Sequence, residues 1–124
     1  MNNYLFVFFG GGLGAAFRYW LTGFVQKNIS SVFPLGTLVV NVVGCFAIGF
    51  LMMIFEERFL VNPSLRIFLT IGILGGFTTF SSFGYETISL LRDGELAFAA
   101  INIFASVAVC LLSAYVGTLL GKLL

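Results

Sequence analysis

The chain has 124 residues, of which 60% are hydrophobic and 9% are charged, with a net charge of +1 and no histidine. This composition, with a mean hydropathy of +1.10, excludes an ordinary soluble domain and predicts an integral membrane protein, whose uncharged runs have the length of helices. The lack of histidine, of a thiol–base pair, of a carboxylate pair and of a phosphate-binding loop also argues against an enzyme.

Four apolar segments follow one another along the chain, each long enough to cross a hydrocarbon core about 30 Å thick. We expect helices over about 4–26, 34–56, 65–91 and 95–121, so that residues 1–124 form a single four-helix transmembrane domain. The connections between them are too short to fold independently. The sequence therefore predicts an all-α, multi-pass membrane protein.

The first segment combines small residues with one arginine. Gly10–Gly12 and Gly14 would let a neighbouring helix approach closely, which is the commonest role of glycine in a membrane. Arg18 lies beyond the middle of the segment, beside two aromatic residues that favour the membrane interface. It therefore either reaches towards the interface as a snorkelling side chain or attracts anions into a vestibule. The segment lacks the basic leader of a signal peptide, so we expect it in the mature fold.

Two polar residues lie on one face of the second segment. Thr37 and Asn41 are four residues apart, which places them above one another on a helix. The amide of Asn41 offers two N–H donors and one carbonyl acceptor. Two interpretations remain open for it, a hydrogen bond to another helix and a contact with a ligand in a polar pathway.

The third segment is interrupted by the run GGFTTFSSF, from Gly75 to Phe83. We expect the helix to break near 75–79, and a break in the membrane is tolerated only against protein or a polar pathway. Phe80 and Phe83 are three residues apart and share a face if the helix resumes. The positive edges of their rings could contact an anion, although phenylalanines at this spacing more often pack in a core.

A polar stripe follows the fourth segment at intervals of three or four residues. Such a stripe either forms a seam between two helices or lines a path for ions or water, and taken alone the seam is favoured. Cys45, in the second segment, and Cys110 are expected to pack as small apolar side chains, without a disulfide or a metal site. The stripe consists of Asn102, Ser106, Cys110, Ser113 and Gly117.

Basic residues are divided almost equally between the two sides of the membrane. Four crossings place Arg58, Arg66 and Lys122 on one side and Lys27 and Arg92 on the other. Because so small a difference in basic residues between the two sides determines the orientation only weakly, copies could insert both ways and pair as an antiparallel dimer. Alternatively, the small bias suffices or an insertion factor decides the orientation.

Three motifs, each in its own segment, resemble those of the Fluc (CrcB) family of fluoride channels, and the resemblance covers essentially the whole chain. They are GGLGAAFRY at 11–19, GTLVVNVVG at 36–44 and GILGGFTTFSSF at 72–83. The resemblance implies an antiparallel, dual-topology homodimer in the bacterial inner membrane, with two pathways that export fluoride passively from the cytoplasm and relieve its toxicity. No nucleic-acid partner is expected.

The resemblance also implies roles for individual residues. A structural sodium ion, which is not transported, would be bound by the backbone carbonyls of Gly75 and Thr78 from both subunits, and Arg18 would lie in a vestibule. The chain departs from the family at Cys110, where a hydroxyl is expected, and at Asn102, where the family can carry an aromatic residue. The implied fluoride pathway consists of Asn41, Phe80, Ser81, Phe83, Ser106 and Thr37.

The alternative from another class is a small four-helix, proton-coupled drug exporter. Such a protein needs a titrating carboxylate near the membrane centre. The only acid near a span, Glu86, lies close to the end of the third segment. A third class, a membrane anchor that transports nothing, would leave the interrupted helix unexplained. The sequence therefore favours the fluoride channel.

Overall fold

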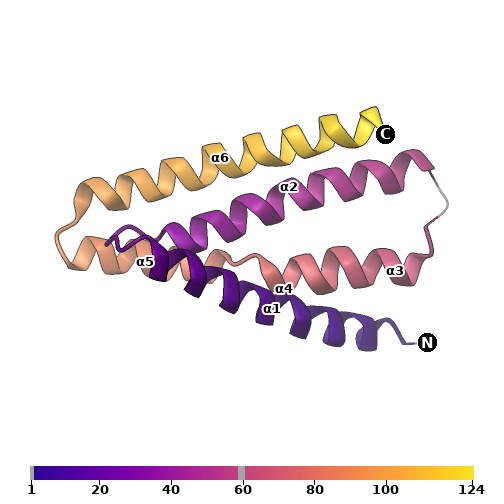
Figure 1. Ribbon diagram of the computed structural model, residues 1–124, viewed down its shortest axis with the longest axis horizontal. Coiled ribbons are helices and arrows are strands. Elements are labelled where there is room, and N and C mark those ends of the chain that lie inside the picture. The colour runs from indigo at the N-terminus through magenta and orange to yellow at the C-terminus, as the bar shows by residue number, and fades with distance from the viewer. Residues whose placement is uncertain (1, 59–60) are drawn as a thin grey trace.

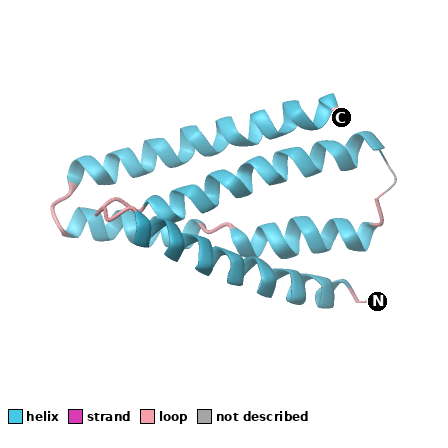
Figure 2. Cartoon of the chain, viewed as in Figure 1, coloured by secondary structure: helices cyan, strands magenta, loops and turns pink. Residues whose placement is uncertain are grey.

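The computed structural model describes residues 2–58 and 61–124, which form helices joined by short connections and contain no β-strand (Figures 1 and 2). The predicted all-α membrane fold is thereby confirmed. The elements are α1 (Asn3–Asn28), α2 (Leu35–Arg58), α3 (Pro63–Ile67), the π-helical stretch η1 (Phe68–Leu74), α4 (Gly75–Phe77), α5 (Phe80–Arg92) and α6 (Leu96–Leu123).

The chain runs to and fro along one axis (Figure 1). The two termini, the end of α2 and the start of α3 lie at one end of the molecule, and the connections that follow α1 and α5 lie at the other. At the second of these connections Gly94 has a positive φ of 77°, which glycine adopts at little cost after the end of a helix. This path leaves α2 and α6 parallel and side by side.

Three helical stretches in the described residues are long and apolar enough to cross a membrane: α2, the run Pro63–Arg92, and α6. The sequence predicts a further crossing over 4–26. α1 is long enough for it, at 26 residues, and it packs along η1 and α4. It is less apolar than the other three because it contains Arg18 and several glycines, so its crossing stays a prediction.

Glycines allow α1 to approach the backbone of the third segment. A Cβ atom added to Gly10 would lie 2.7 Å from the carbonyl oxygen of Phe68, and one added to Gly14 would lie 2.8 Å from the amide nitrogen of Phe77. Gly12 differs, since an added Cβ would have nothing within 4 Å. The small face of α1 is therefore a packing surface formed by some of its glycines and not by all of them.

A second close seam joins α2 to α6. An added Cβ at Gly117 would overlap the backbone carbonyl of Phe46. Ser113 belongs to the same seam, because its hydroxyl donates a hydrogen bond of 2.8 Å to the carbonyl of Val42. The C-terminal part of the polar stripe on α6, Ser113 and Gly117, thus joins α6 to α2, as the seam interpretation predicts.

The third segment is interrupted later than its glycines suggest. Gly75 is helical, with φ −63° and ψ −37°, whereas Thr78 (φ −81°, ψ 156°) and Thr79 (φ −150°, ψ 117°) are extended. The sequence predicts a break over about 75–79, with Gly75 providing the turn. Instead Gly76 packs against the backbone of Gly11. Here glycine serves helix contact, and the two threonines form the break.

Candidate functional site

Two pockets open beside the break. The larger has a volume of about 840 Å³ and is lined by α1, α2 and α5. The smaller, of about 340 Å³, is lined by α2, the break, α5 and α6. Thr79 lines both of them. Thr79, in the extended stretch at the break, is therefore a lining residue that the two pockets share.

The smaller pocket collects most of the predicted pathway residues. Asn41, Phe80, Phe83 and Ser106 all line it, although they come from three different helices. The rings of the two phenylalanines are tilted by 35° with their centroids 5.3 Å apart, and the Phe80 side chain is 82% exposed. Ser81 lies on α5 but lines neither pocket. The pocket offers ring edges, an amide and a hydroxyl in one place.

Asn41 holds the break by two hydrogen bonds. Its Nδ2 atom donates to the carbonyl of Thr79 at 3.0 Å, and its Oδ1 atom accepts from the amide N–H of Thr79 at 2.8 Å. An extended peptide in a membrane has no helical partners for these two groups, so the asparagine supplies both. A hydrogen bond from Asn41 to another segment, one of the two interpretations that the sequence leaves open, is thus present, and within the described residues one N–H of Asn41 has no partner.

Thr79 caps the helix that follows. Its hydroxyl accepts a hydrogen bond of 3.1 Å from the amide N–H of Ser82, as an N-cap residue does. The Ser81 hydroxyl lies 3.2 Å from the same oxygen. This role of Thr79 is not among the sequence-based predictions, although a threonine directly before a resumed helix is an N-cap signal.

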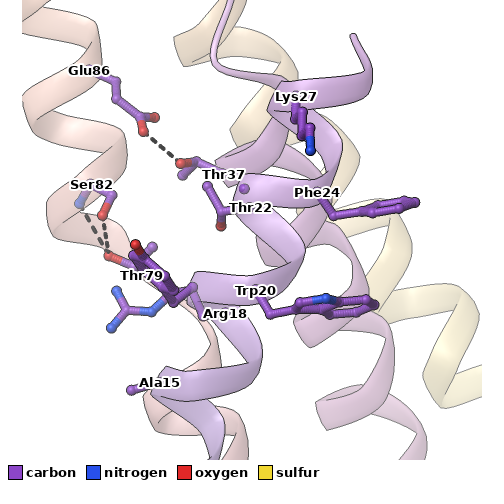
Figure 3. Close-up of a pocket in the computed structure, with 12 residues that line it drawn as sticks. Ala15, Arg18, Trp20, Thr22, Phe24, Lys27, Thr37, Thr79, Ser82 and Glu86 are labelled. Carbon is purple, nitrogen blue, oxygen red and sulfur yellow. Dashed lines mark hydrogen bonds between the residues drawn. The ribbon is translucent and has the colours of Figure 1, made fainter.

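The larger pocket, shown in Figure 3, combines cationic and polar side chains. Arg18 and Lys27 line it from α1, Thr37 lines it from α2 and Glu86 from α5. The Thr37 hydroxyl donates a hydrogen bond of 2.7 Å to Oε1 of Glu86, and Oε2 of Glu86 is buried without a partner in the described residues. The two basic side chains of this pocket outnumber its one acidic side chain, Glu86, and a surplus of positive charge beside a concave, partly apolar surface raises the local concentration of anions. Arg18 is thus placed where a vestibule residue would be.

A chain of hydrogen bonds joins α5 to α6 beside the smaller pocket. Asn102, only 2% exposed, donates at 3.0 Å to the hydroxyl of Thr87, which donates at 2.7 Å to the carbonyl of Phe83. The Ser106 hydroxyl donates to Oδ1 of Asn102 at 3.4 Å. The N-terminal part of the α6 stripe, Asn102 and Ser106, therefore positions α5. The sequence alone could not identify Thr87 as the partner of Asn102.

The backbone at the break provides oxygen atoms of the kind that hard cations bind. In an uninterrupted helix the Gly75 carbonyl would accept from the N–H of Thr79, but that N–H donates to Asn41. The N–H of Thr78 donates to the Leu74 carbonyl at 3.0 Å. The Gly75 carbonyl has thus lost its helical donor, as a carbonyl that binds a hard cation would, and cation binding by Gly75 and Thr78 stays a prediction.

Known proteins resemble this chain over nearly its whole length. A family model described as "CrcB-like protein, Camphor Resistance (CrcB)" matches residues 5–118. A protein of Geotalea uraniireducens named "Fluoride-specific ion channel FluC" is 47% identical over 124 residues, which is 100% of both chains. Proteins of the same name from Geotalea daltonii and Geobacter metallireducens are 47% identical over 117 residues and 50% identical over 112 residues, covering 94% and 90% of each chain.

Proposed function

The chain belongs to the CrcB family, and from this premise we propose that it is a fluoride-selective channel through which fluoride leaves the cytoplasm passively. It is a multi-pass membrane protein and a transporter, not an enzyme. The observation that carries the proposal is the smaller pocket, in which Asn41, Phe80, Phe83 and Ser106 converge beside the break. Full-length relatives named as fluoride channels support the fluoride channel over the drug-exporter alternative.

Fluoride is small and strongly hydrated, so a pathway must replace its water with close donors. Asn41 retains one N–H, and the Ser106 hydroxyl, held to Asn102 only at 3.4 Å, can rotate to donate to an anion. The edges of Phe80 and Phe83 add weak positive potential. Within the described residues no lysine or arginine lines the smaller pocket, and such a charge would hold the ion too tightly for conduction.

The larger pocket suits an entrance to this pathway. Arg18 and Lys27 concentrate fluoride there while remaining outside the smaller pocket. Thr37 and Ser82 carry hydroxyl groups from this entrance towards Thr79. An anion passing along them would move from a charged region to a neutral one, which favours entry without trapping.

The first test is fluoride efflux from liposomes that contain the purified protein, measured with a fluoride electrode. We expect rapid fluoride efflux and no comparable chloride efflux. The variants Phe80→Ile and Phe83→Ile keep bulk and lose the ring edge, and should each slow efflux about two- to tenfold, taking the roughly 0.5–1.5 kcal/mol of an aromatic pair as the scale for a ring-edge contact. Phe8→Ile is the matched control, because Phe8 is an exposed aromatic of α1 that lines neither pocket.

Equal passage of chloride and fluoride would overturn the selective channel. Unchanged fluoride efflux in both phenylalanine variants would show that the two rings serve packing and do not contact fluoride. A channel that fails only in the Phe8→Ile variant would place the pathway elsewhere in the molecule.

We also propose that two copies pair antiparallel, with one sodium ion bound between them by the carbonyls of Gly75 and Thr78 from each copy. The nearly equal distribution of basic residues supports dual topology. Gly75 is an exposed residue whose carbonyl lacks the Thr79 N–H as a helical donor, which supports a cation at the break. The ion would stabilise the paired copies and would not be transported.

Removal of sodium should therefore weaken the dimer. When sodium is replaced throughout purification by N-methyl-D-glucamine, we expect later elution in size-exclusion chromatography and a lower unfolding midpoint, because a ligand bound only by the folded dimer stabilises it. Restoring sodium should reverse both changes. An unchanged elution volume and midpoint after thorough exchange would count against the ion.

A further inference from the structure

Both cysteines of the chain line the smaller pocket. Cys45 comes from α2 and Cys110 from α6, and each is a free, half-buried thiol. From the sequence they are expected to pack as small apolar side chains, without a metal site. In the structure, however, the two thiols line one pocket as close neighbours. The fold thus brings together two soft ligand groups that are far apart in the sequence.

The register of the two helices accounts for this pairing. α2 and α6 run side by side in the same direction (Figure 1), and an added Cβ at Gly49 would overlap the carbonyl of Ala114. Cys45 and Cys110 each precede this contact by four residues, or about one helical turn. Parallel helices keep their register over one turn, so the cysteines face each other as well.

The next turn places the cysteines relative to the predicted pathway. Asn41 and Ser106 precede Cys45 and Cys110 by four residues each, and all four side chains line the smaller pocket. The thiol pair therefore lies about one turn, roughly 5.4 Å, along the seam from the amide and hydroxyl of the pathway.

We propose that Cys45 and Cys110 form a two-thiol site that binds one soft metal ion of the Cu(I), Ag(I) or Hg(II) class. Soft thiolate ligands select such ions. Zinc fits poorly, since it takes four ligands and the described residues contain no group of three or more histidine, cysteine or acidic side chains. Each thiol loses its proton to water as its sulfur–metal bond forms, so no oxidant is needed.

The bound ion would hinder the pathway, a consequence that rests on the proposed function. It places bulk in the pocket that Asn41 and Ser106 line. Because both thiols are deprotonated, a bound Ag(I) or Cu(I) ion leaves a net negative charge there, which repels a passing anion. Metal-loaded protein should therefore lose most of its fluoride efflux.

Silver ion is the probe for the site itself. Purified protein in detergent is treated with silver nitrate in chloride-free buffer, passed through a column containing a competing monothiol, and assayed for bound metal. We expect the wild type to retain about one ion per chain, because two thiols held together bind with a high effective concentration. Cys45→Ser and Cys110→Ser should each lose most of the retained silver. The double variant, which keeps the three methionines, corrects for binding by thioethers.

Retention of two ions per chain, or equal retention in a single-serine variant, would overturn the paired site. Efflux is then measured with and without silver, each protein being compared with its own metal-free rate. The wild type should lose most of its efflux and the double variant should not respond. Retained silver with undiminished wild-type efflux would overturn the blocking effect. A wild type without any fluoride efflux would count against the proposed function, while metal retention would still decide the site.

Discussion

The Gly14→Ala variant is expected to unfold at a clearly lower temperature than the wild type. The added methyl group would overlap the carbonyl of Ile73 and lie 2.8 Å from the amide nitrogen of Phe77. These are backbone atoms, so α1 would have to move away from η1 and α4. Alanine gains about 1 kcal/mol of helix propensity over glycine, but overpacking typically costs about 1–3 kcal/mol and more where the backbone cannot relax. The measurement is the unfolding midpoint in detergent by circular dichroism.

Gly12→Ala is the matched control for this result. Gly12 lies two residues away in the same helix, and its added methyl would have nothing within 4 Å. Its unfolding midpoint should stay the same or rise, since only the gain in helix propensity remains. If Gly14→Ala and Gly12→Ala have the same midpoint, the contact of α1 with the third segment is not the close backbone packing described above.

The second large effect is expected for Asn41→Ala. This change removes both hydrogen bonds to the Thr79 peptide, and each buried polar group left without a partner costs about 1–3 kcal/mol. The break then loses its attachment to α2, and the smaller pocket loses its amide. We expect a lower unfolding midpoint together with fluoride efflux reduced by about two orders of magnitude, which corresponds to about 2.7 kcal/mol.

The two readouts distinguish the possible roles of Asn41. An asparagine that only contacts fluoride would leave the unfolding midpoint unchanged, and one that only supports the break would lower the midpoint with a smaller loss of efflux. Val43→Ala is the control, because this exposed residue of α2 lines neither pocket. Normal stability and normal efflux in Asn41→Ala would contradict both roles.

The sequence was most informative where the physical cause is local. Apolar runs predict the helices, and an interruption by glycine and threonine predicts a break in the third segment. Its position was less predictable, because Gly75 and Gly76 can serve either a turn or a close helix contact. Only the packing against Gly11 assigns Gly76 to helix contact, whereas a Cβ atom added to Gly75 would lie no closer than 3.8 Å to the carbonyl oxygen of Thr70.

Partners across helices were beyond the reach of sequence reasoning. Thr37 and Glu86 are 49 residues apart yet share a hydrogen bond, and no spacing rule connects them. The same holds for Cys45 and Cys110, which become neighbours only through the parallel register of α2 and α6. A single sequence shows which residue types are present on each helix face, and the relative rotation of the helices decides which faces meet.

The hydrogen bonds between Asn41 and the main chain of Thr79 should tolerate mutation at position 79 better than mutation at position 41. The groups that Asn41 binds are the main-chain N–H and C=O of residue 79, and every residue type except proline carries both. Substitutions at position 79 other than proline therefore cannot remove these two bonds directly, whereas most substitutions at position 41 remove both at once. Only replacing the amide by an ester, through chemical synthesis of the chain, would delete the N–H donor alone and measure its contribution separately.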